Sequence, residues 1–503
     1  MDDRSPATPE RDGESWRDLR EWLALIHRQG ELRTISAEVD PKEELSAITF
    51  LSTRSAGAPA LLFEKLASNR SDARVLINML AASKERYALT VGLDPKQPVR
   101  DLIAATRKIM KRRLPPAIIE RDEAPVNEVV LSGDEIDMTR YPSPTFWPGD
   151  GGPYTGTGNV TLIRNPDTGV INVGVYRQML HGPRKLGINM VPGRHGALNC
   201  EAWWARGEPC PVVVAYGIDP ALFIAATQVF GHSESELDVA GGLMGAPVEM
   251  TAADLVDLPI PARAELVIEG HIHQGELEQE GPLGEFHGYY SGKTDRRPVI
   301  TVNRVHQRRS PIMTAALMAT YPSCEIGEYH AIMRSARVWD NLESMGVPGV
   351  MGVYVYPASA SAAGLMVVSL KQLYPGHVAQ VLALAAQSPA AAYCIRWIIA
   401  VDDDVDPTDI NQVMWAMSVR SNPSDDIDIL RKTWSYRTDP SLAPDVRPYG
   451  SKALIDACEP HRFRATMAKR AYLRQAVYER VVSRWGELGL PGTPPVQTHF
   501  HEE

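Results

Sequence analysis

The chain has 503 residues, which at roughly 150 residues per domain predicts about three domains. Its hydrophobic share of 44% and charged share of 23% are typical of a globular protein, and its net charge of −10 disfavours nucleic acid or an anionic membrane surface as the main partner. The five scattered cysteines have no CxxC spacing, which argues against a disulfide framework or a zinc ribbon. With apolar runs too short to span a bilayer, we expect a cytoplasmic protein that acts on small molecules.

The N-terminal region alternates helix and strand patterns. Residues 1–14 are acidic and polar and predict a disordered leader. Apolar residues then recur at helical spacing between Ser15, the expected N-cap, and Gly30. The alternation continues to the proline-containing stretch RRLPPAIIERDEAP, so we expect an N-terminal α/β domain over residues 15–118.

Residues 119–320 have a different texture, with short β-rich runs separated by turns. NVTLIR and VINVGVYRQ flank the turn NPDTG, which predicts a β-hairpin. In AELVIEGHIHQGEL, apolar and polar residues alternate, and a solvated polar face carrying Glu269, His271 and His273 is favoured over a metal site. Many short strands in one segment predict a barrel or closed sheet.

Beyond residue 320 the helix and strand alternation returns, which predicts a C-terminal α/β domain over residues 321–458. The run VDDDVD has the aspartate spacing of a calcium loop but lacks the glycine and the final glutamate of that loop, so acidic residues at a strand end and helix N-terminus are favoured. Within residues 459–490 the apolar stripe of Leu473, Val477, Val481 and Trp485 predicts one long terminal helix that serves oligomerisation, followed by a polar tail over residues 491–503.

Residues 172–196, NVGVYRQMLHGPRKLGINMVPGRHG, gather cationic and amide side chains among glycines. Such a set suits the binding of an anion. A metal ion ligated by oxygen and nitrogen atoms and purely structural ion pairs are the other interpretations. In an ideal strand Asn172 and Arg177 point to opposite faces, so a shared site requires a bulge or a strand end near Gly174.

Two glutamates, Glu280 and Glu285, flank the sequence Gly-Pro-Leu-Gly, which favours a type I turn. A regular strand or helix would point the two carboxylates apart, whereas a turn can bring both to one cavity. An arginine between them would keep one ionised and let the other carry a proton. Solvated glutamates beside a hairpin are the alternative that these residues alone leave open.

Taken together, these segments resemble the UbiD family of prenylated-FMN-dependent decarboxylases. The resemblance covers nearly the whole chain and rests on NVGVYRQ, VPGRHGA, SESELDVAGGLMG, AELVIEGHIHQGELEQEGPLGEFHGYY, VDDDVDPTDINQVMWAMSVR and YGSKALIDA. It implies an α+β multidomain fold: an N-terminal α/β lobe, a central flavin-reductase-like split β-barrel that holds the cofactor, and a C-terminal α/β lobe with a long terminal helix. It also implies a homodimer or a higher homo-oligomer, such as a trimer of dimers.

The resemblance further implies the roles of individual residues. The catalytic set falls on Arg177, Glu280 and Glu285, and the metal set, which holds Mn²⁺ or Mg²⁺ with K⁺ beside it, on Asn172, His195 and Glu236. The implied cofactor contacts are Asn172, Val175, Tyr176, Arg177, Asn189, Met190, Val191, Arg194, His195, Glu236 and Lys452. Phe286, next to Glu285, is a candidate contact for the substrate ring, with core packing as the equal alternative.

The implied reaction is the reversible, non-oxidative decarboxylation of an aromatic or α,β-unsaturated acid, such as a hydroxybenzoate, a cinnamic-type acid or a polycyclic acid like phenazine carboxylate. Loss of CO₂ leaves electrons on carbon that no side chain can accept, so prenylated FMN, made by a separate flavin prenyltransferase, would take them through a covalent adduct. Arg177 would hold the carboxylate, Glu280 would position Arg177, and Glu285 would protonate the carbon. An FMN-dependent oxidoreductase on a split barrel and a non-catalytic cofactor-carrying subunit are the alternatives.

Overall fold

The computed structural model describes residues 16–55, 57–67, 69–228, 230, 234–292, 294–497 and 500. It divides into two compact units. Unit 1 comprises Met1–Arg337, Val355–Gly364 and Ser435–Pro448, and unit 2 comprises Val338–Tyr354, Leu365–Trp434 and Tyr449–Glu503. The expected leader lies outside the described residues. None of the described helices has the length and apolarity needed to cross a bilayer.

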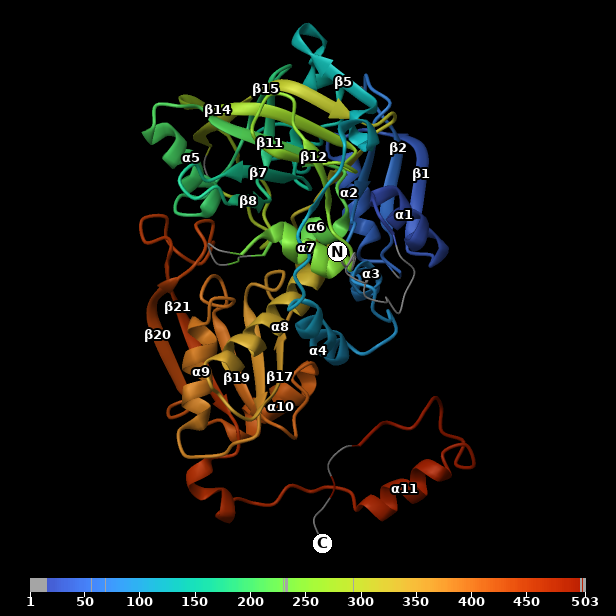
Figure 1. Ribbon diagram of the computed structural model, residues 1–503. Helices are drawn as coiled ribbons and strands as arrows, with labels where there is room; N and C mark the ends of the chain where they lie inside the picture. The colour runs from blue at the N-terminus through green and yellow to red at the C-terminus, as the bar shows by residue number, and fades with distance from the viewer. Residues whose placement is uncertain are drawn as a thin grey trace, which may run out of the picture. The chain divides into compact units, whose positions relative to one another are not determined.

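The N-terminal part of unit 1 is built on a four-stranded sheet in the order β1-β2-β3-β16. Strands β1 and β2 of this sheet lie side by side in Figure 1. Strand β1 runs parallel to β2, β2 antiparallel to β3, and β3 parallel to β16, so a strand from far along the chain completes this sheet. Its elements are α1 Leu19–Arg28, β1 Leu32–Val39, α2 Glu44–Ser52, β2 Ala60–Leu66, β3 Arg74–Ile77, α3 Lys84–Thr90, α4 Val99–Ile109 and β16 Ile312–Ala315.

Helix α1 begins later than the sequence pattern suggested. Its N-cap is Asp18, whose carboxylate accepts the Glu21 N–H at 2.9 Å. The expected cap, Ser15, lies outside the described residues, and Trp16 is buried just before the helix. The apolar stripe of α1 is buried as predicted, and Trp22 donates its indole N–H to Thr90 at 3.0 Å.

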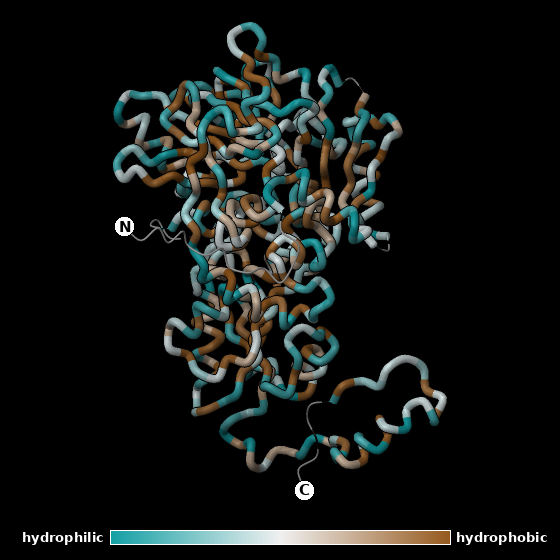
Figure 2. Tube along the Cα trace, turned by 45° about the vertical axis from the view of Figure 1, so that its right-hand side comes forward, coloured by the Kyte–Doolittle hydropathy of each residue, from teal (hydrophilic) through white to brown (hydrophobic). Residues whose placement is uncertain are grey.

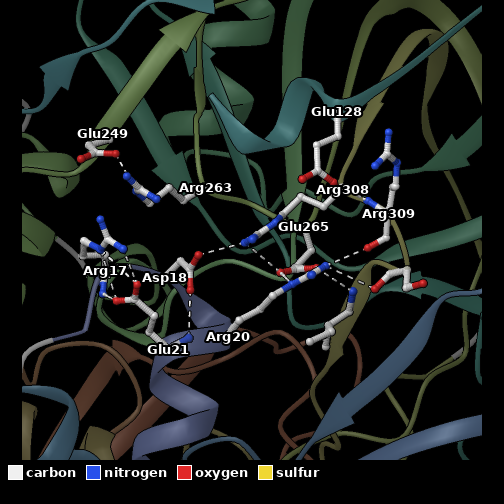
Figure 3. A network of polar contacts seen from close by, with 12 residues as sticks. Arg17, Asp18, Arg20, Glu21, Glu128, Glu249, Arg263, Glu265, Arg308 and Arg309 are labelled. Atoms are coloured by element: carbon white, nitrogen blue, oxygen red, sulfur yellow. Dashed lines mark hydrogen bonds and ion pairs between the residues drawn. The ribbon is translucent and has the colours of Figure 1, made fainter. Parts of the chain in front are cut away.

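A buried carboxylate ties α1 to the strands of the central sheet (Figure 3). Glu265 is fully buried just before β14, Leu266–Glu280, and receives both Nε and Nη2 of Arg20 at 2.7 Å. Arg308 bridges Glu265 and the cap Asp18 at 3.3 and 2.9 Å. A bidentate guanidinium offsets the cost of burying this carboxylate, so the contact also specifies the orientation of α1.

The central part of unit 1 is a nine-stranded sheet in the order β6-β9-β10-β15-β14-β11-β7-β8, with β5 paired to β15. Strands β14 and β15, Asp295–Gln307, form its long antiparallel pair (Figure 1). The predicted hairpin is confirmed, because β7 and β8 pair antiparallel around residues 165–170. The other strands are β5 Val129–Ser132, β6 Tyr154–Gly156, β7 Val160–Arg164, β8 Ile171–Gly174, β9 Gln178–Gly182, β10 Lys185–Gly187 and β11 Cys210–Tyr216.

The helices of this region are α5 His195–Ala205, α6 Pro220–Ala226 and α7 Glu236–Met244, and a small sheet is formed by β13 Pro259–Pro261, β12 Glu249–Ala252 and β4 Ala117–Ile118. Short 3₁₀ turns span Arg121–Glu123, Pro125–Glu128, Gly133–Glu135 and Met138–Arg140. In the hydropathy-coloured trace of Figure 2, hydrophobic segments gather in the interior and hydrophilic segments predominate in the outer loops. A continuous core runs from β1–β3 to the central strands, which agrees with their apolar sequences.

One prediction for β14 is wrong: its polar face is not uniformly solvated. Glu269 is fully buried and accepts the backbone N–H groups of Asp254, Leu255 and Val256 at 2.8, 2.7 and 3.1 Å. His306 on β15 lies 2.7 Å from the same carboxylate. The loop after β12 supplies these donors, and strand alternation alone gives no sign of it. His273 is exposed, as expected.

Unit 2 contains a five-stranded sheet in the order β17-β18-β19-β21-β20. Strands β18, β19 and β21 are parallel, and β20 runs antiparallel to β21 at the edge. The elements are β17 Val350–Val355, β18 Leu365–Leu370, α9 His377–Gln387, β19 Trp397–Asp402, α10 Ile410–Arg420, β20 Ile427–Trp434 and β21 Tyr449–Ala457. Helix α8, Gly327–Ser344, crosses the boundary between the units along the chain.

The terminal segment is not the single long helix that its apolar stripe predicted. A 3₁₀ helix, His461–Thr466, contains the non-helical Phe463, and α11 spans only Gln475–Ser483. None of the residues of α11 is buried. Amphipathic helices of this length gain most of their stability from burying the apolar face, so the periodic pattern alone does not maintain a continuous helix.

Candidate active site

The centre of the candidate site is Arg177, in the short segment between β8 and β9. Strand β8 ends at Gly174 and β9 begins at Gln178, so the strand end needed between Asn172 and Arg177 is present. Arg177 donates Nε and Nη2 to Glu280 at 2.7 and 2.9 Å, and Nη1 to Glu285 at 2.6 Å. Both glutamates therefore converge on one guanidinium, each through a different edge of the fork.

The loop between these glutamates differs from the type I turn suggested by its sequence. The Gly281–Pro282 bond is cis, and the Gly284 N–H donates to Asp150 at 2.9 Å instead of to the Gly281 carbonyl. The Pro282 carbonyl accepts the Gly151 N–H at 2.8 Å. The loop is therefore held by the neighbouring segment 146–151, whose Asp150 sequence reasoning did not single out.

Three further side chains complete the polar surroundings of Arg177. The Tyr154 hydroxyl donates to Glu280 at 3.1 Å, and Ser291 accepts from Arg177 Nη2 at 3.3 Å. With its amide turned to satisfy both of its atoms, Asn189 accepts from Arg177 Nε and Nη2 at 3.0 and 2.9 Å. Sequence reasoning assigned Asn189 to cofactor contact and did not identify Tyr154 or Ser291; the position of Ser291 in the β14–β15 connection was the available signal.

Burial and neighbouring charges shift the pKa values of Arg177 and Glu285. Burial disfavours the charged form of Arg177, but the carboxylates of Glu285 and Glu280 outweigh this effect and raise its pKa. Burial also raises the pKa of Glu285, with Arg177 opposing that shift and Glu280 adding to it. Glu280 is 2% exposed and carries a bidentate pair with Arg177. The arrangement holds Glu280 on the arginine through two hydrogen bonds and leaves Glu285 able to hold a proton.

A second group of the implied residues meets beside Gly174. The Val173 N–H donates to Glu236 Oε2 at 3.2 Å, which brings the first residue of α7 next to Asn172 on β8. The Asn172 amide lies 3.4 Å from the Tyr176 hydroxyl. A Cβ at Gly196 would lie 2.4 Å from that hydroxyl, so Tyr176 packs against the first turn of α5, which begins at His195.

The chemistry of this second group fits a divalent cation. Glu236 is 5% exposed, and burial raises its pKa to about 7. Among the described residues, no lysine or arginine pairs with its carboxylate. A cation ligated by Glu236 and the Asn172 oxygen would offset the cost of burying that charge. The first turn of α5 also carries no acidic residue, so its N–H groups can face an anion such as a phosphate.

Family models account for most of the chain. The N-terminal, Rift-related and C-terminal domain models of 3-octaprenyl-4-hydroxybenzoate carboxy-lyase match residues 23–106, 117–322 and 329–457. The chain belongs to the UbiD family. The family and the structures similar to this chain are decarboxylases, so the chain is an enzyme of the carboxy-lyase class, and the α+β multidomain fold with a curled central sheet agrees with the prediction.

Solved structures of UbiD-class enzymes match over almost their full length. HmfF from Pelotomaculum thermopropionicum in complex with FMN is 29% identical, with a TM-score of 0.79 over 91% of this chain and 97% of that chain; an evolved dimeric form of HmfF was solved with prFMN. The closed form of vanillic acid decarboxylase from Sedimentibacter hydroxybenzoicus is 26% identical, with a TM-score of 0.85 over 95% and 99%. A 3,4-dihydroxybenzoic acid decarboxylase from Enterobacter cloacae is also 26% identical, with a TM-score of 0.78 over 92% and 98%.

The remaining residues implied by the UbiD resemblance lie at several places. Asn189, Met190 and Val191 follow β10 and lead to Arg194, the N-cap of α5. Val175 lies in the segment between β8 and β9, two residues before Arg177. Met190 is part of the core. Phe286 is half-buried and meets the ring of Tyr436 edge-on, with centroids 5.3 Å apart. Lys452 belongs to unit 2, where its ammonium donates to the carbonyls of Ala386 and Ala391 at 2.8 Å each.

A different cluster has the composition of a metal site but the contacts of a structural one. Among the described residues, Asp254, Glu269 and His306 form the one group of three whose ligand atoms all lie within 4.8 Å of one another. Arg121 already holds Asp254 through two hydrogen bonds of 3.0 and 2.9 Å. Since Glu269 is satisfied by three backbone donors, this cluster stabilises the junction of β14, β15 and the loop after β12.

Proposed function

We propose that this UbiD-family enzyme is a reversible, non-oxidative decarboxylase of an aromatic carboxylic acid that works with prenylated FMN. The observation that carries the proposal is the convergence of Glu280 and Glu285 on Arg177, in a chain that matches UbiD models in all three parts. Similar structures are named for decarboxylases of vanillic and 3,4-dihydroxybenzoic acid, which supports an aromatic substrate.

Arg177 is the group that binds the substrate carboxylate. Its guanidinium keeps its charge beside Glu280, which receives Nε and Nη2 and fixes the plane of the fork. The remaining Nη1 donates to Glu285 at 2.6 Å. An arriving carboxylate takes that Nη1 donor in place of Glu285, because one anion can replace another on the same N–H group. Binding of substrate thus releases the acid from its ion pair.

Glu285 is the proton donor. Once released from Arg177 in a buried environment, its carboxylate favours the protonated form. It then delivers the proton to the carbon that loses CO₂. Each turnover converts a carboxylate and one proton into the product and CO₂, so Glu285 must regain a proton from solvent after every cycle.

Prenylated FMN, when bound, supplies the electron sink that the departing CO₂ requires. Asn172 and Glu236, with His195 at the N-terminus of α5, are the residues proposed to hold Mn²⁺ or Mg²⁺, together with K⁺, against its phosphate. Glu236 is buried and has no lysine or arginine partner among the residues that the structure describes, and the first turn of α5 carries no acidic residue; both features support this assignment. Val175, Tyr176, Asn189, Met190, Val191, Arg194 and Lys452 are proposed as further contacts of the cofactor.

The deciding experiment is co-expression with a flavin prenyltransferase, followed by a screen of hydroxybenzoic, cinnamic and polycyclic acids for CO₂ release. Mass spectrometry of the released flavin identifies its form. CO₂ release together with a prenylated flavin supports the proposal. Plain FMN with consumption of NAD(P)H would instead identify an oxidoreductase, and bound flavin without any turnover would identify a cofactor-carrying subunit.

A further inference from the structure

A second feature of unit 1 lies beside the proposed acid. A cavity of about 230 Å³ is lined by Phe50, Trp147, Tyr289, Tyr290, Met318, Ala319, Thr320, Gly284, Gly288 and Glu285. Glu285 is the one charged residue among them, and Arg177 is not part of the lining. An apolar cavity of about 150 Å³ can bind benzene, so this cavity has room for a substituted aromatic ring.

The walls of the cavity are aromatic and closely packed. Phe50 from α2 and Trp147 meet edge to face, with centroids 5.6 Å apart. A Cβ at Gly284 would lie 2.2 Å from the Trp147 ring, and one at Gly288 would lie 2.5 Å from Thr320. The loop that carries Glu285 therefore fits between these two side chains only through glycine.

The mouth of the cavity faces solvent. Tyr289 and Tyr290 are 63% and 43% exposed, and the Tyr290 hydroxyl accepts the Gly149 N–H at 2.9 Å. Two exposed tyrosines beside a wall of Phe and Trp provide flat surfaces on which a planar ligand can stack.

Arg54 is not part of the lining but contacts two residues that are, Phe50 and Thr320. The Arg54 guanidinium lies 3.6 Å from the centroid of the Phe50 ring and donates to the Thr320 hydroxyl at 2.9 Å. Its other partners are the Ser323 hydroxyl and the Phe50 and Thr320 carbonyls, and no carboxylate pairs with it in the described part of the chain. Arg54 therefore keeps its positive charge available for an anion.

We infer that this cavity is a vestibule that binds a planar aromatic carboxylate, with the ring between the aromatic walls and the carboxylate at Arg54. The inference rests on the proposed function, because the ligand is the acid on which Arg177 and Glu285 act. It adds a site that Glu285 lines but Arg177 does not: the vestibule holds the acid beside Glu285 before the carboxylate reaches Arg177. Arg54 is thus a binding determinant for anionic aromatic ligands.

The test compares a charged ligand with a neutral ligand of the same shape. Isothermal titration calorimetry of the full-length holoenzyme with 2-naphthoate and 2-naphthamide measures the two affinities. Arg54→Gln is expected to weaken naphthoate binding about tenfold, the worth of a charge-assisted hydrogen bond, and to leave naphthamide binding unchanged. Arg54→Lys, which keeps the charge, is expected to recover part of the loss. Ala319→Leu, which fills the cavity, is expected to weaken both ligands.

Arg33→Gln is the matched control, because Arg33 is an exposed arginine on β1 that does not line the cavity. It should change neither affinity. With a substrate found by the acid screen, Arg54→Gln should raise KM by a larger factor than it lowers kcat. Equal effects of Arg54→Gln and Arg33→Gln on naphthoate, or full naphthoate affinity in Ala319→Leu, would overturn the vestibule.

The two proposals fail in different ways. If wild-type enzyme releases CO₂ from aromatic acids while Arg54→Gln keeps wild-type affinity and KM, the vestibule is wrong and the decarboxylase stands. If naphthoate binds in an Arg54-dependent manner but no acid is decarboxylated, the vestibule stands and the proposed reaction is wrong.

Discussion

Strand β14 and the loop that follows it carry two glutamates in opposite situations: Glu269 near the start of the strand, and Glu285 five residues beyond its end. At its start, Glu269 receives three backbone N–H groups and His306, and these donors lower its pKa although burial by itself raises it. In the loop beyond the strand, Glu285 has one donor among the described residues, Arg177 Nη1, and burial raises its pKa. A carboxylate with all its donors provided is fixed in its ionised form and stabilises the fold. One held by a single exchangeable donor can change its partner and its proton.

The largest expected effect is that of substituting Glu285. Glu285→Gln keeps the size of the side chain and removes the proton, so CO₂ release should fall by on the order of 10²- to 10⁴-fold or become undetectable. Bound flavin, measured by its absorbance spectrum, should be unchanged. Turnover at the wild-type rate in this variant would mean that the proton comes from another group.

Glu236 extends the comparison to a third glutamate, which is buried, accepts the Val173 N–H and has no lysine or arginine partner in the described part of the chain. Glu236→Ala should lower the content of divalent metal, measured by plasma mass spectrometry, to background and should lose flavin with it. Asn172→Ala should act in the same direction. Glu234→Ala, two residues before Glu236 and paired with Arg113 on the surface, is the matched control and should retain both. Full metal and flavin occupancy in Glu236→Ala would exclude the proposed metal site.

Substitution of Glu269 should lower the stability of the protein and leave the rate of the reaction unchanged. Glu269→Gln replaces an ionised acceptor that serves four donors, and the free energy of unfolding should fall by about 1–3 kcal/mol. A lower urea midpoint with unchanged kcat per folded enzyme is expected. A large loss of kcat at full stability would show that Glu269 is not separate in function from the catalytic residues.

Features that depend on neighbouring residues in the sequence could be predicted, whereas features that depend on distant residues could not. The hairpin of β7 and β8 could be predicted from its turn sequence. The convergence of Glu280 and Glu285 on Arg177 was predicted from the family resemblance, whereas the type I turn expected between the two glutamates was wrong. The burial of Glu269 could not, since its donors come from residues 254–256 and from β15. Strand alternation describes which face a residue occupies and carries no information about what covers that face.

The terminal segment is a second case in which the sequence pattern alone predicted the wrong structure. Its apolar stripe is regular, but residues 467–474 are not helical and α11 is short. Periodicity predicts a helix when a partner surface buries the stripe, and none of the α11 residues is buried here. Tyr154 and Ser291 were missed because a tyrosine and a serine in loops have no spacing signal, and only the position of Glu280 and Arg177 gives them a role.

The smallest expected effect, and the finest test of the comparison, is the pH dependence of stability. A glutamate in an unfolded chain titrates near a pKa of about 4.3. The raised pKa of Glu285 means that its contribution to stability is fully present below this value and is lost as the pH rises toward its folded pKa. The lowered pKa of Glu269 means the reverse: its contribution is present above this value and is lost as the pH falls through its folded pKa.

Urea unfolding from about pH 3 to about pH 8 should therefore show wild type losing stability relative to Glu285→Gln as the pH rises, and relative to Glu269→Gln as the pH falls. Differences that change in the same direction for both variants would mean that the two buried glutamates are in equivalent environments, which their hydrogen-bond partners contradict.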